Sequence, residues 1–354
     1  MSATSALAEG RSRALPAFLG KSVRLLATIA VTIFGLLVVT FLIGRVVPVD
    51  PVLSVVGDRA SQSTYDKVYV ELGLDRPLYV QFAIYVEKAV TGDFGESLLT
   101  KKPIIDDIAR AFPATLELAT VAILIGTLFG IPFGVWAAVR QGRLVDQVVR
   151  IVGLMGYSAP IFWLGLLGLL IFYAKWGIVA GPGRIDISYE YAFTPTTGLF
   201  LIDTAMQGQW AAFRNVVSHI ALPAALLGYF SMAYIARMTR SFMLNELAQE
   251  YIVTARVKGV AEWRIIWVHA LRNAAVPLVT VVTLSYASLL EGSVLTETVF
   301  AWPGLGQYLT NSLQNADMNA VLGGTLLIGI IFVGLNLLSD FLYTVLDPRV
   351  RRRA

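Results

Sequence analysis

Long runs of apolar residues dominate the chain, and each is about long enough to cross a bilayer as a helix. A hydrocarbon core of about 30 Å requires about 20 apolar residues at the helical rise. A backbone in lipid must satisfy its own hydrogen bonds, which favours helices over loops. The pattern therefore predicts an all-α polytopic membrane protein with six transmembrane helices, over residues 25–44, 115–139, 151–174, 216–235, 274–295 and 320–346.

The first apolar run has a basic flank that resembles the start of a secretory signal, with Arg11, Arg13, Lys21 and Arg24 before it. Signal sequences have apolar regions of roughly 7–15 residues, followed by a cleavage site between small residues. This run is longer and no such site follows. We interpret it as a retained transmembrane helix.

Positive charge alternates along the connections between the predicted helices. The segments before the first helix, after the second, after the fourth and at the C-terminus are all basic. By contrast, residues 45–112 hold eight basic and ten acidic residues, and the connection after the fifth helix has Glu297 and Asp317 with no basic residue. Cytoplasmic loops carry the excess of Lys and Arg. Both termini are therefore predicted to be cytoplasmic.

The connection between the first and second helices is long enough to hold structure of its own. Residues 61–72 and 81–89 are predicted to be short helices on either side of a turn. Residues 175–215 are rich in Gly, Pro, Thr and aromatic residues, which indicates an ordered loop with little regular structure. The predicted organisation is a cytoplasmic tail (1–20), the first helix with a large extracytoplasmic loop (21–112), a core of five helices (113–346) and a basic cytoplasmic tail (347–354).

Composition also indicates lipid as the main solvent. The chain is 56% hydrophobic and 15% charged with a mean hydropathy of +0.68, whereas soluble domains contain about 25% charged residues. This excludes an ordinary cytosolic enzyme. The net charge of +4 is distributed among loops, so no nucleic-acid partner is expected. With no cysteine, and with His219 and His269 in different segments, we expect no metal site in this chain.

No nucleotide site or catalytic group is predicted. The sequence Gly20-Lys21-Ser22 resembles the end of a phosphate-binding loop, but Leu15 occupies the position where that loop needs a glycine. We interpret Lys21 as a basic residue at the membrane entry. Ionisable residues lie almost entirely in loops, so neither a general acid/base pair nor a nucleophilic triad is indicated.

Small residues form a stripe along the second predicted helix. Gly126, Gly130 and Gly134 are spaced four residues apart, and Ala138 continues the stripe. This spacing lets another helix approach closely and gain packing contacts. We predict a helix-packing role for these glycines. Prolines that can kink helices lie within or beside the predicted spans, at Pro132, Pro160, Pro223 and Pro277.

Three acidic residues lie within or next to the predicted spans: Glu117, Glu291 and Asp340. Ionisable residues in such positions are candidates for function. We expect Glu117 and Glu291 to lie close enough to the outer interface to be hydrated; for Asp340, Arg349 and a neighbouring helix are the available options for pairing. No partner can be identified for any of them, which disfavours a proton relay.

The long cytoplasmic connection over residues 246–273 is the most informative segment. Its first half is predicted to be a helix that ends near Gly259, because glycine is a common helix stop. The end of this helix carries the small residues Thr254 and Ala255, with Arg256 and Lys258 beside them. Such a helix suits a groove on a cytoplasmic partner. It equally suits the bilayer surface as an amphipathic helix.

The second half of the connection is predicted to start a new helical turn at Ala261. The residues Trp263, Ile266, Trp267 and Ala270 then recur at helical spacing. They are expected to form an apolar face.

Short motifs follow one another in a fixed order along nearly the whole chain after about residue 20. Residues 254–259 (TARVKG) are followed by 269–274 (HALRNA) in the cytoplasmic connection. The order resembles that of ABC-importer permeases, in the branch that serves dipeptides, oligopeptides and nickel. The other matching segments are 72–78 (LGLDRPL), 92–97 (GDFGES), 113–118 (PATLEL), 162–165 (FWLG), 296–306 (TETVFAWPGLG) and 346–349 (LDPR).

In that superfamily the cytoplasmic loop carries a Glu-Ala-Ala-x-x-x-Gly pattern followed by Ile-x-Leu-Pro, and it forms the coupling helix that docks on the ATPase. Ala255, Gly259 and Leu271 match the pattern. The departures are Val253 for Glu, Thr254 for the first Ala, His269 for Ile and Arg272 for Pro. The resemblance implies that Thr254, Ala255 and Gly259 form the docking tip, with Arg256 and Lys258 as polar contacts.

The resemblance also implies partners and a location. They are a second homologous permease subunit, two ATPase subunits and an extracytoplasmic solute-binding protein, in the cytoplasmic (inner) membrane of a bacterium. ATP and magnesium would be used by the ATPase subunits, so this chain is expected to need no cofactor and to be no enzyme. Transport would proceed by alternating access, with peptides as the leading substrates ahead of nickel, sugars and opines.

An ion-coupled secondary transporter that acts without an ATPase is the alternative. Such a protein needs coupling residues at mid-membrane and commonly contains internal repeats. Neither is evident in this sequence.

Overall fold

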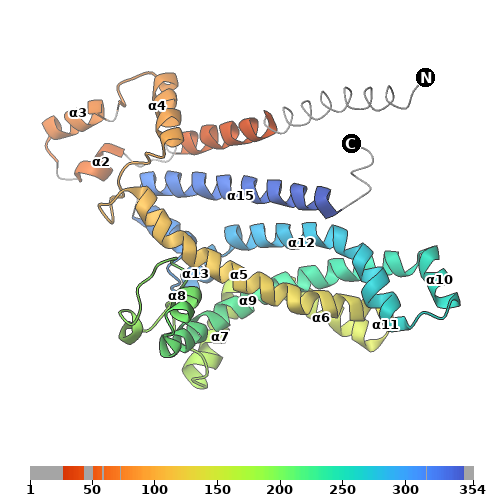
Figure 1. The fold of residues 1–354 in the computed structure, drawn as a ribbon. Helices are drawn as coiled ribbons and strands as arrows, with labels where there is room; N and C mark the ends of the chain where they lie inside the picture. The colour runs from red at the N-terminus through yellow and green to blue at the C-terminus, as the bar shows by residue number, and fades with distance from the viewer. Residues whose placement is uncertain (1–26, 44–50, 58–59, 72, 316, 347–354) are drawn as a thin grey trace, which may run out of the picture.

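The computed structural model describes residues 27–43, 51–57, 60–71, 73–315 and 317–346, and this part of the chain is almost entirely helical. Long helices lie side by side, and shorter helices gather at the two ends of the bundle (Figure 1). At one end are α2 (Pro51–Val56), α3 (Gln62–Glu71), α4 (Leu78–Thr91), α8 (Phe200–Met206), α13 (Val294–Val299) and α14 (Leu305–Gln314). At the other end are α10 (Glu250–Val257) and α11 (Glu262–Arg264).

Four helical segments in the described residues are long and apolar enough to cross a membrane. They correspond to the second, fourth, fifth and sixth predicted spans. The four are Ile104–Val139 (α5), Trp210–Leu247 (α9), Glu262–Gly292, which ends in α12 (Leu271–Gly292), and Met318–Leu338, within α15 (Met318–Leu346).

The single helix predicted over residues 151–174 is wrong. Two helical pieces, α6 (Leu144–Ser158) and α7 (Ile161–Gly168) with its π-helical continuation Leu169–Lys175, meet at an angle of 97°. Pro160 explains the break, because it disfavours helical backbone in the residue before it. Ala159 is accordingly extended, with φ −95° and ψ 133°. Within the described residues, this bent pair counts as a fifth span if its two helices cross the membrane as one unit.

The first predicted span is represented by a shorter helix, Ala27–Ile43. The residues on either side of it, and the tail from residue 347 onward, lie outside the described part of the chain. A first span over residues 25–44 therefore stays a prediction. The short helices predicted over 61–72 and 81–89 are confirmed as α3 and α4.

Tertiary contacts move two helix ends from their predicted positions. α5 begins at Ile104 rather than near residue 115, because Ile104 and Ile108 pack against Leu305 and Ala320 and are almost fully buried. The fifth span ends at Gly292 rather than at residue 295. From there the chain turns into α13.

The glycine stripe of α5 lies directly against α9. A Cβ atom on Gly126 would come within 2.6 Å of Ser231 Oγ, and one on Gly134 within 2.5 Å of the Ala236 carbonyl oxygen. Gly130 is similarly close to Ile235, with a Cβ contact of 3.0 Å. Real Cβ atoms essentially never approach as closely as those at Gly126 and Gly134 would, and the contact at Gly130 would be tight, so a side chain on this stripe would push the two helices apart.

The loop over residues 175–215 is more regular than predicted, because it contains a short 3-10 turn (Ile187–Tyr189) and α8. Asp203 organises its turn: its carboxylate accepts hydrogen bonds from the backbone and side chains of Thr196 and Thr197 and from Gly198 N–H. Burial alone would raise the pKa of Asp203, but these donors outweigh it and hold the pKa below its ordinary value.

Candidate functional site

The end of the bundle that carries α10 has the local structure that the sequence pattern indicates. α10 stops at Val257, and Gly259 has φ +76°, a left-handed conformation that favours glycine. Val260 N–H then donates to the Ala255 carbonyl at 3.1 Å, and Gly259 N–H to the Arg256 carbonyl at 2.9 Å. These bonds satisfy carbonyl groups at the helix end, as in common glycine-capped helices.

α10 is fixed to the long helices on its inner side. Ile252 is fully buried in an apolar cluster that includes Val135 of α5 and Met243 of α9. The Tyr251 hydroxyl donates to Glu246 Oε2 at 2.6 Å and accepts from Asn273 Nδ2 at 3.0 Å. A force applied to α10 would therefore be transmitted to α5, α9 and α12.

The outer side of α10 presents apolar residues to the surroundings. Val257 is 83% exposed and Val253 55% exposed. Thr254 and Lys258 are also exposed, whereas Ala255 is half-buried and packs toward the apolar cluster under α10. Sequence reasoning overlooked both valines. Their spacing of four residues places them on one face of the helix, but only the burial of Ile252 shows that this face is exposed.

Of the two basic residues near the tip, Arg256 already has a partner in this chain. Arg256 Nε lies 2.8 Å from Glu262 Oε1, and both side chains are exposed. An exposed ion pair of this kind contributes about 0–1 kcal/mol to the free energy of unfolding. Arg256 can therefore leave Glu262 for a carboxylate on a partner with little loss of stability. Lys258 is exposed beside it.

The apolar face predicted after Gly259 is wrong in part. The backbone over Ile265–Ala270 is π-helical, which shifts the facing of the side chains relative to an α-helix. Ile265 and Ala270 are buried, whereas Trp263 is 60% and Trp267 46% exposed. The two tryptophans therefore lie on the surface near α10.

At the opposite end of the bundle, Glu117 is buried rather than hydrated, which corrects the prediction for this residue. It is 5% exposed, and Oε2 lies 2.6 Å from Nη2 of Arg184, itself 6% exposed. Leu201 N–H donates to the other carboxylate oxygen at 2.7 Å. Burial lowers the pKa of Arg184, and the neighbouring Glu117 opposes that shift. Glu291 is exposed, and the side chain of Asp340 lies outside the described residues.

A buried carboxylate, Glu297, joins two of the sequence motifs. Its Oε1 accepts hydrogen bonds from Thr115 Oγ1 at 2.6 Å and Ser293 Oγ at 3.0 Å, and its Oε2 accepts from Gln307 N–H at 3.0 Å. A Cβ atom on Gly304 would come within 2.5 Å of the carboxylate. Burial raises the pKa of Glu297, although the donors partly offset this effect.

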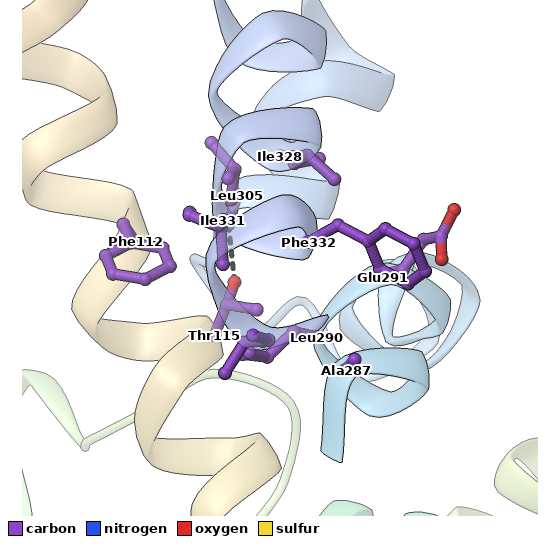
Figure 2. A pocket seen from close by; sticks show the side chains of 10 residues that line it. Phe112, Thr115, Ala287, Leu290, Glu291, Leu305, Ile328, Ile331 and Phe332 are labelled. Atoms are coloured by element: carbon purple, nitrogen blue, oxygen red, sulfur yellow. Dashed lines mark hydrogen bonds between the residues drawn. The ribbon is translucent and has the colours of Figure 1, made fainter. Parts of the chain in front are cut away.

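The contacts between Thr115, Glu297 and Leu305, called the junction below, lie beside the space between α5, α12 and α15. Thr115 Oγ1 accepts a hydrogen bond from Leu305 N–H at 2.8 Å, next to apolar side chains that include Phe112 and Ile331 (Figure 2). The remaining cavity has a volume of about 10 Å³, which is no more than a single water molecule needs. The space between α5, α12 and α15 is therefore almost filled by side chains.

A third motif, the segment 92–97, contacts Asp317 just before the start of α15. Asp317 is fully buried, and its Oδ2 accepts hydrogen bonds from Ser97 Oγ and Leu98 N–H, both at 2.7 Å. The segments 113–118 and 296–306 meet through the bond between Thr115 and Glu297, and Phe94 of segment 92–97 packs against the cluster that contains Leu305.

Comparison with known proteins gives consistent matches along the chain. Residues 130–352 match the family described as "binding-protein-dependent transport system inner membrane component", and residues 18–119 match the N-terminal part of such membrane components. The chain is 42% identical to the probable D,D-dipeptide transport system permease protein DdpB of Escherichia coli K12, over 92% of this chain and 95% of that protein.

Two further similarities extend this result. The dipeptide transport system permease DppB of E. coli K12 is 41% identical over 93% of this chain and 98% of its own length. Among solved structures, an inward-facing conformation of the MetNI methionine ABC transporter matches with a TM-score of 0.50 and 19% identity, over 70% of this chain and 99% of that chain. The chain therefore belongs to the binding-protein-dependent transport system inner membrane components, the permease subunits of ABC importers.

Proposed function

We propose that this permease subunit carries di- or oligopeptides into a bacterial cell by alternating access. The single observation that supports this substrate class most directly is the set of relatives more than 40% identical over more than 90% of both chains, which are named as dipeptide permeases. Membership of an ABC-importer family favours this function over an ion-coupled secondary transporter that acts without an ATPase.

The proposal includes the assembly implied by the family. A second homologous permease would complete the pathway, two ATPase subunits would use ATP and magnesium, and a solute-binding protein would deliver the peptide. The alternation of basic and acidic connections supports cytoplasmic termini. In that orientation α10 faces the cytoplasm, and the junction, together with Glu117 and Asp317, faces the binding protein.

Residues Thr254 to Gly259 are proposed as the contact with the ATPase. Support comes from the exposure of Val253 and Val257 on an otherwise anchored helix, because exposed apolar anchors commonly occupy pockets on a partner. Arg256 and Lys258 would add polar contacts at the rim, and Gly259 would end the helix so that its tip can enter a pocket. Closure of the ATPase pair would then move α10, and with it the long helices.

This contact is tested by Val257→Glu and Gly259→Glu in the assembled transporter. A buried apolar anchor contributes about 2 kcal/mol or more to binding, which corresponds to about a 30-fold change in affinity. We expect both variants to reach the membrane but to lose ATP-dependent uptake and co-purification of the ATPase subunits. Because Gly259 has positive φ, Val257→Glu is the variant free of backbone strain.

The control is Ile187→Glu, in the loop that carries Arg184, the partner of Glu117 at the opposite end; the Ile187 side chain is 82% exposed. It should keep the ATPase subunits bound. Normal uptake and ATPase recovery by Val257→Glu would refute the docking role of α10. Purification of the wild type alone, with uptake driven by an ion gradient without ATP, would instead support the secondary transporter.

A further inference from the structure

Two exposed tryptophans follow α10 in the chain, and with a neighbouring valine they form an apolar face. Trp263 is 60% exposed, Trp267 46% and Val268 43%. On the inner side of the same segment, Ile265 and Ala270 are fully buried in the apolar cluster under α10. The exposed side, called the tryptophan face below (Trp263, Trp267 and Val268), is thus anchored to the bundle but left largely open by the part of the chain that the structure describes.

The tryptophan face lies next to α10. The π-helical segment Ile265–Ala270 packs against α10, and α11 lies at the same end of the bundle (Figure 1). Near the tip of α10, Arg256 Nε lies 2.8 Å from Oε1 of Glu262, the residue that precedes Trp263. A partner that receives the tip of α10 would therefore come close to Trp263.

A lipid surface fits this face less well than a protein does. The predicted span begins at Ala274, which lies about 16 Å after Trp263 and about 10 Å after Trp267 when counted along the helix. The headgroup layer adds only about 5–7 Å on each side of the hydrocarbon core. The exposed residues His269 and Arg272 lie between the tryptophans and the span. The tryptophan face therefore lies beyond the headgroups, on the same side as α10.

The charges around the tryptophan face are mainly basic. The Arg264 guanidinium carbon lies 5.7 Å from the centroid of the Trp263 ring, and Arg264, Lys258 and Arg272 are all exposed. Over residues 258–272 the sequence has one acidic residue, Glu262. Tryptophan and arginine are the residue types that most often contribute large shares of binding energy at protein interfaces. The face therefore fits a protein surface with an apolar patch bordered by carboxylates.

We propose that the tryptophan face is a second contact with the ATPase subunit that receives α10, and that it meets an apolar patch bordered by carboxylates on that subunit. The inference rests on the proposed function, because it requires that α10 docks on an ATPase. Two contacts would fix the orientation of α10 as well as its position. Rotation of the ATPase subunit would then be transmitted to α12, which continues directly from the π-helical segment.

Because the chain contains no cysteine, a single cysteine can report whether the ATPase covers this face. Val268→Cys keeps both tryptophans, Val257→Cys reports the contact of α10, and Ile187→Cys, at an 82% exposed position, is the control. The permease pair in nanodiscs is labelled with a water-soluble maleimide, with and without the ATPase subunits bound. We expect the ATPase subunits to slow labelling at least tenfold at positions 257 and 268 and to leave it unchanged at position 187.

The tryptophans themselves are tested by changing Trp263 and Trp267 together to alanine in the complete transporter. Peptide uptake at saturating concentration should fall at least tenfold, and the yield of co-purified ATPase subunits should fall with it. The peptide concentration for half-maximal uptake, set by the binding protein, should not change. Replacing both by phenylalanine should restore part of the uptake, because the rings keep much of the apolar surface. Trp210→Ala is the matched control, because Trp210 is 60% exposed at the other end of α9.

The outcomes separate this inference from the proposed function. If the ATPase subunits shield Val257→Cys but not Val268→Cys, α10 docks as proposed and the second contact is wrong. If they shield neither, the docking of α10 is wrong as well. Normal uptake by the double alanine variant would also refute the second contact. A fluorophore on Val268→Cys that is quenched by headgroup-labelled lipids, equally with and without the ATPase subunits, would show that the bilayer covers this face and would overturn the inference.

Discussion

Replacing Glu117 by alanine is expected to destabilise the protein by about 3–5 kcal/mol, because it leaves the Arg184 guanidinium buried without its carboxylate. Arg184 is 6% exposed and lies against Phe200, with its guanidinium carbon 3.7 Å from the ring centroid. Without Glu117 it would keep the hydrogen bond from Nη2 to the Gly198 carbonyl, at 2.6 Å, and the weaker electrostatic attraction of Asp203. Unfolding in detergent, followed by tryptophan fluorescence, measures the loss.

The control removes both charges. Glu117→Leu combined with Arg184→Met should recover much of the lost stability, because a buried ion pair can be replaced by apolar residues of similar volume at little cost. The Leu201 N–H that donates to Glu117 would lose its acceptor in both variants, which sets a limit on the recovery. Equal stability of the wild type and Glu117→Ala would show that the pair is hydrated in the membrane-embedded protein.

Replacing Gly134 by leucine is expected to separate α5 from α9 and to prevent assembly of a functional transporter. Even a Cβ atom at this position would come within 2.5 Å of both the Ala236 carbonyl oxygen and Thr239 Cβ, and neither can move away without shifting α9. Overpacking commonly costs about 1–3 kcal/mol, and a larger side chain against backbone should exceed that range. The measurements are the amount of protein in the membrane and its thermal stability in detergent.

Gly334→Leu is the matched substitution for this test. Gly334 lies on the exposed face of α15, and among the described residues no atom outside its own stretch of helix would lie within 4 Å of an added Cβ atom. This variant should accumulate and unfold like the wild type. If Gly134→Leu did the same, the close crossing of α5 and α9 would not be required for folding.

Local patterns allowed much of the architecture to be predicted. Apolar runs identified the segments that form α5, α9, α12 and α15, and a four-residue glycine spacing identified the face of α5 that meets α9. The helix end at Gly259 was also visible, because a left-handed cap depends on one residue and its neighbours. Each of these features is encoded within a few turns of helix.

The errors arose where a proline or distant residues decide the outcome. Hydropathy predicted one continuous helix over residues 151–174, but the chain bends by 97° at Pro160. The prediction failed because the number of apolar residues says nothing about backbone geometry. Glu117 was expected to be hydrated, since its partner Arg184 is 67 positions away in a loop. The exposed valines of α10 were overlooked because only packing shows which face of a short helix is covered.

The sequence by itself indicated a membrane protein and the family that it resembles. It also determined which segments are helical and where the charged connections between them lie. These properties follow from hydrophobic length, charge and short motifs, all of which act locally along the chain. Only the tertiary structure decided which buried carboxylates have partners and how three distant motifs meet around Glu297 and Asp317. Those features depend on contacts between segments that are far apart in the sequence. Such contacts stabilise the protein only once the helices have packed against one another.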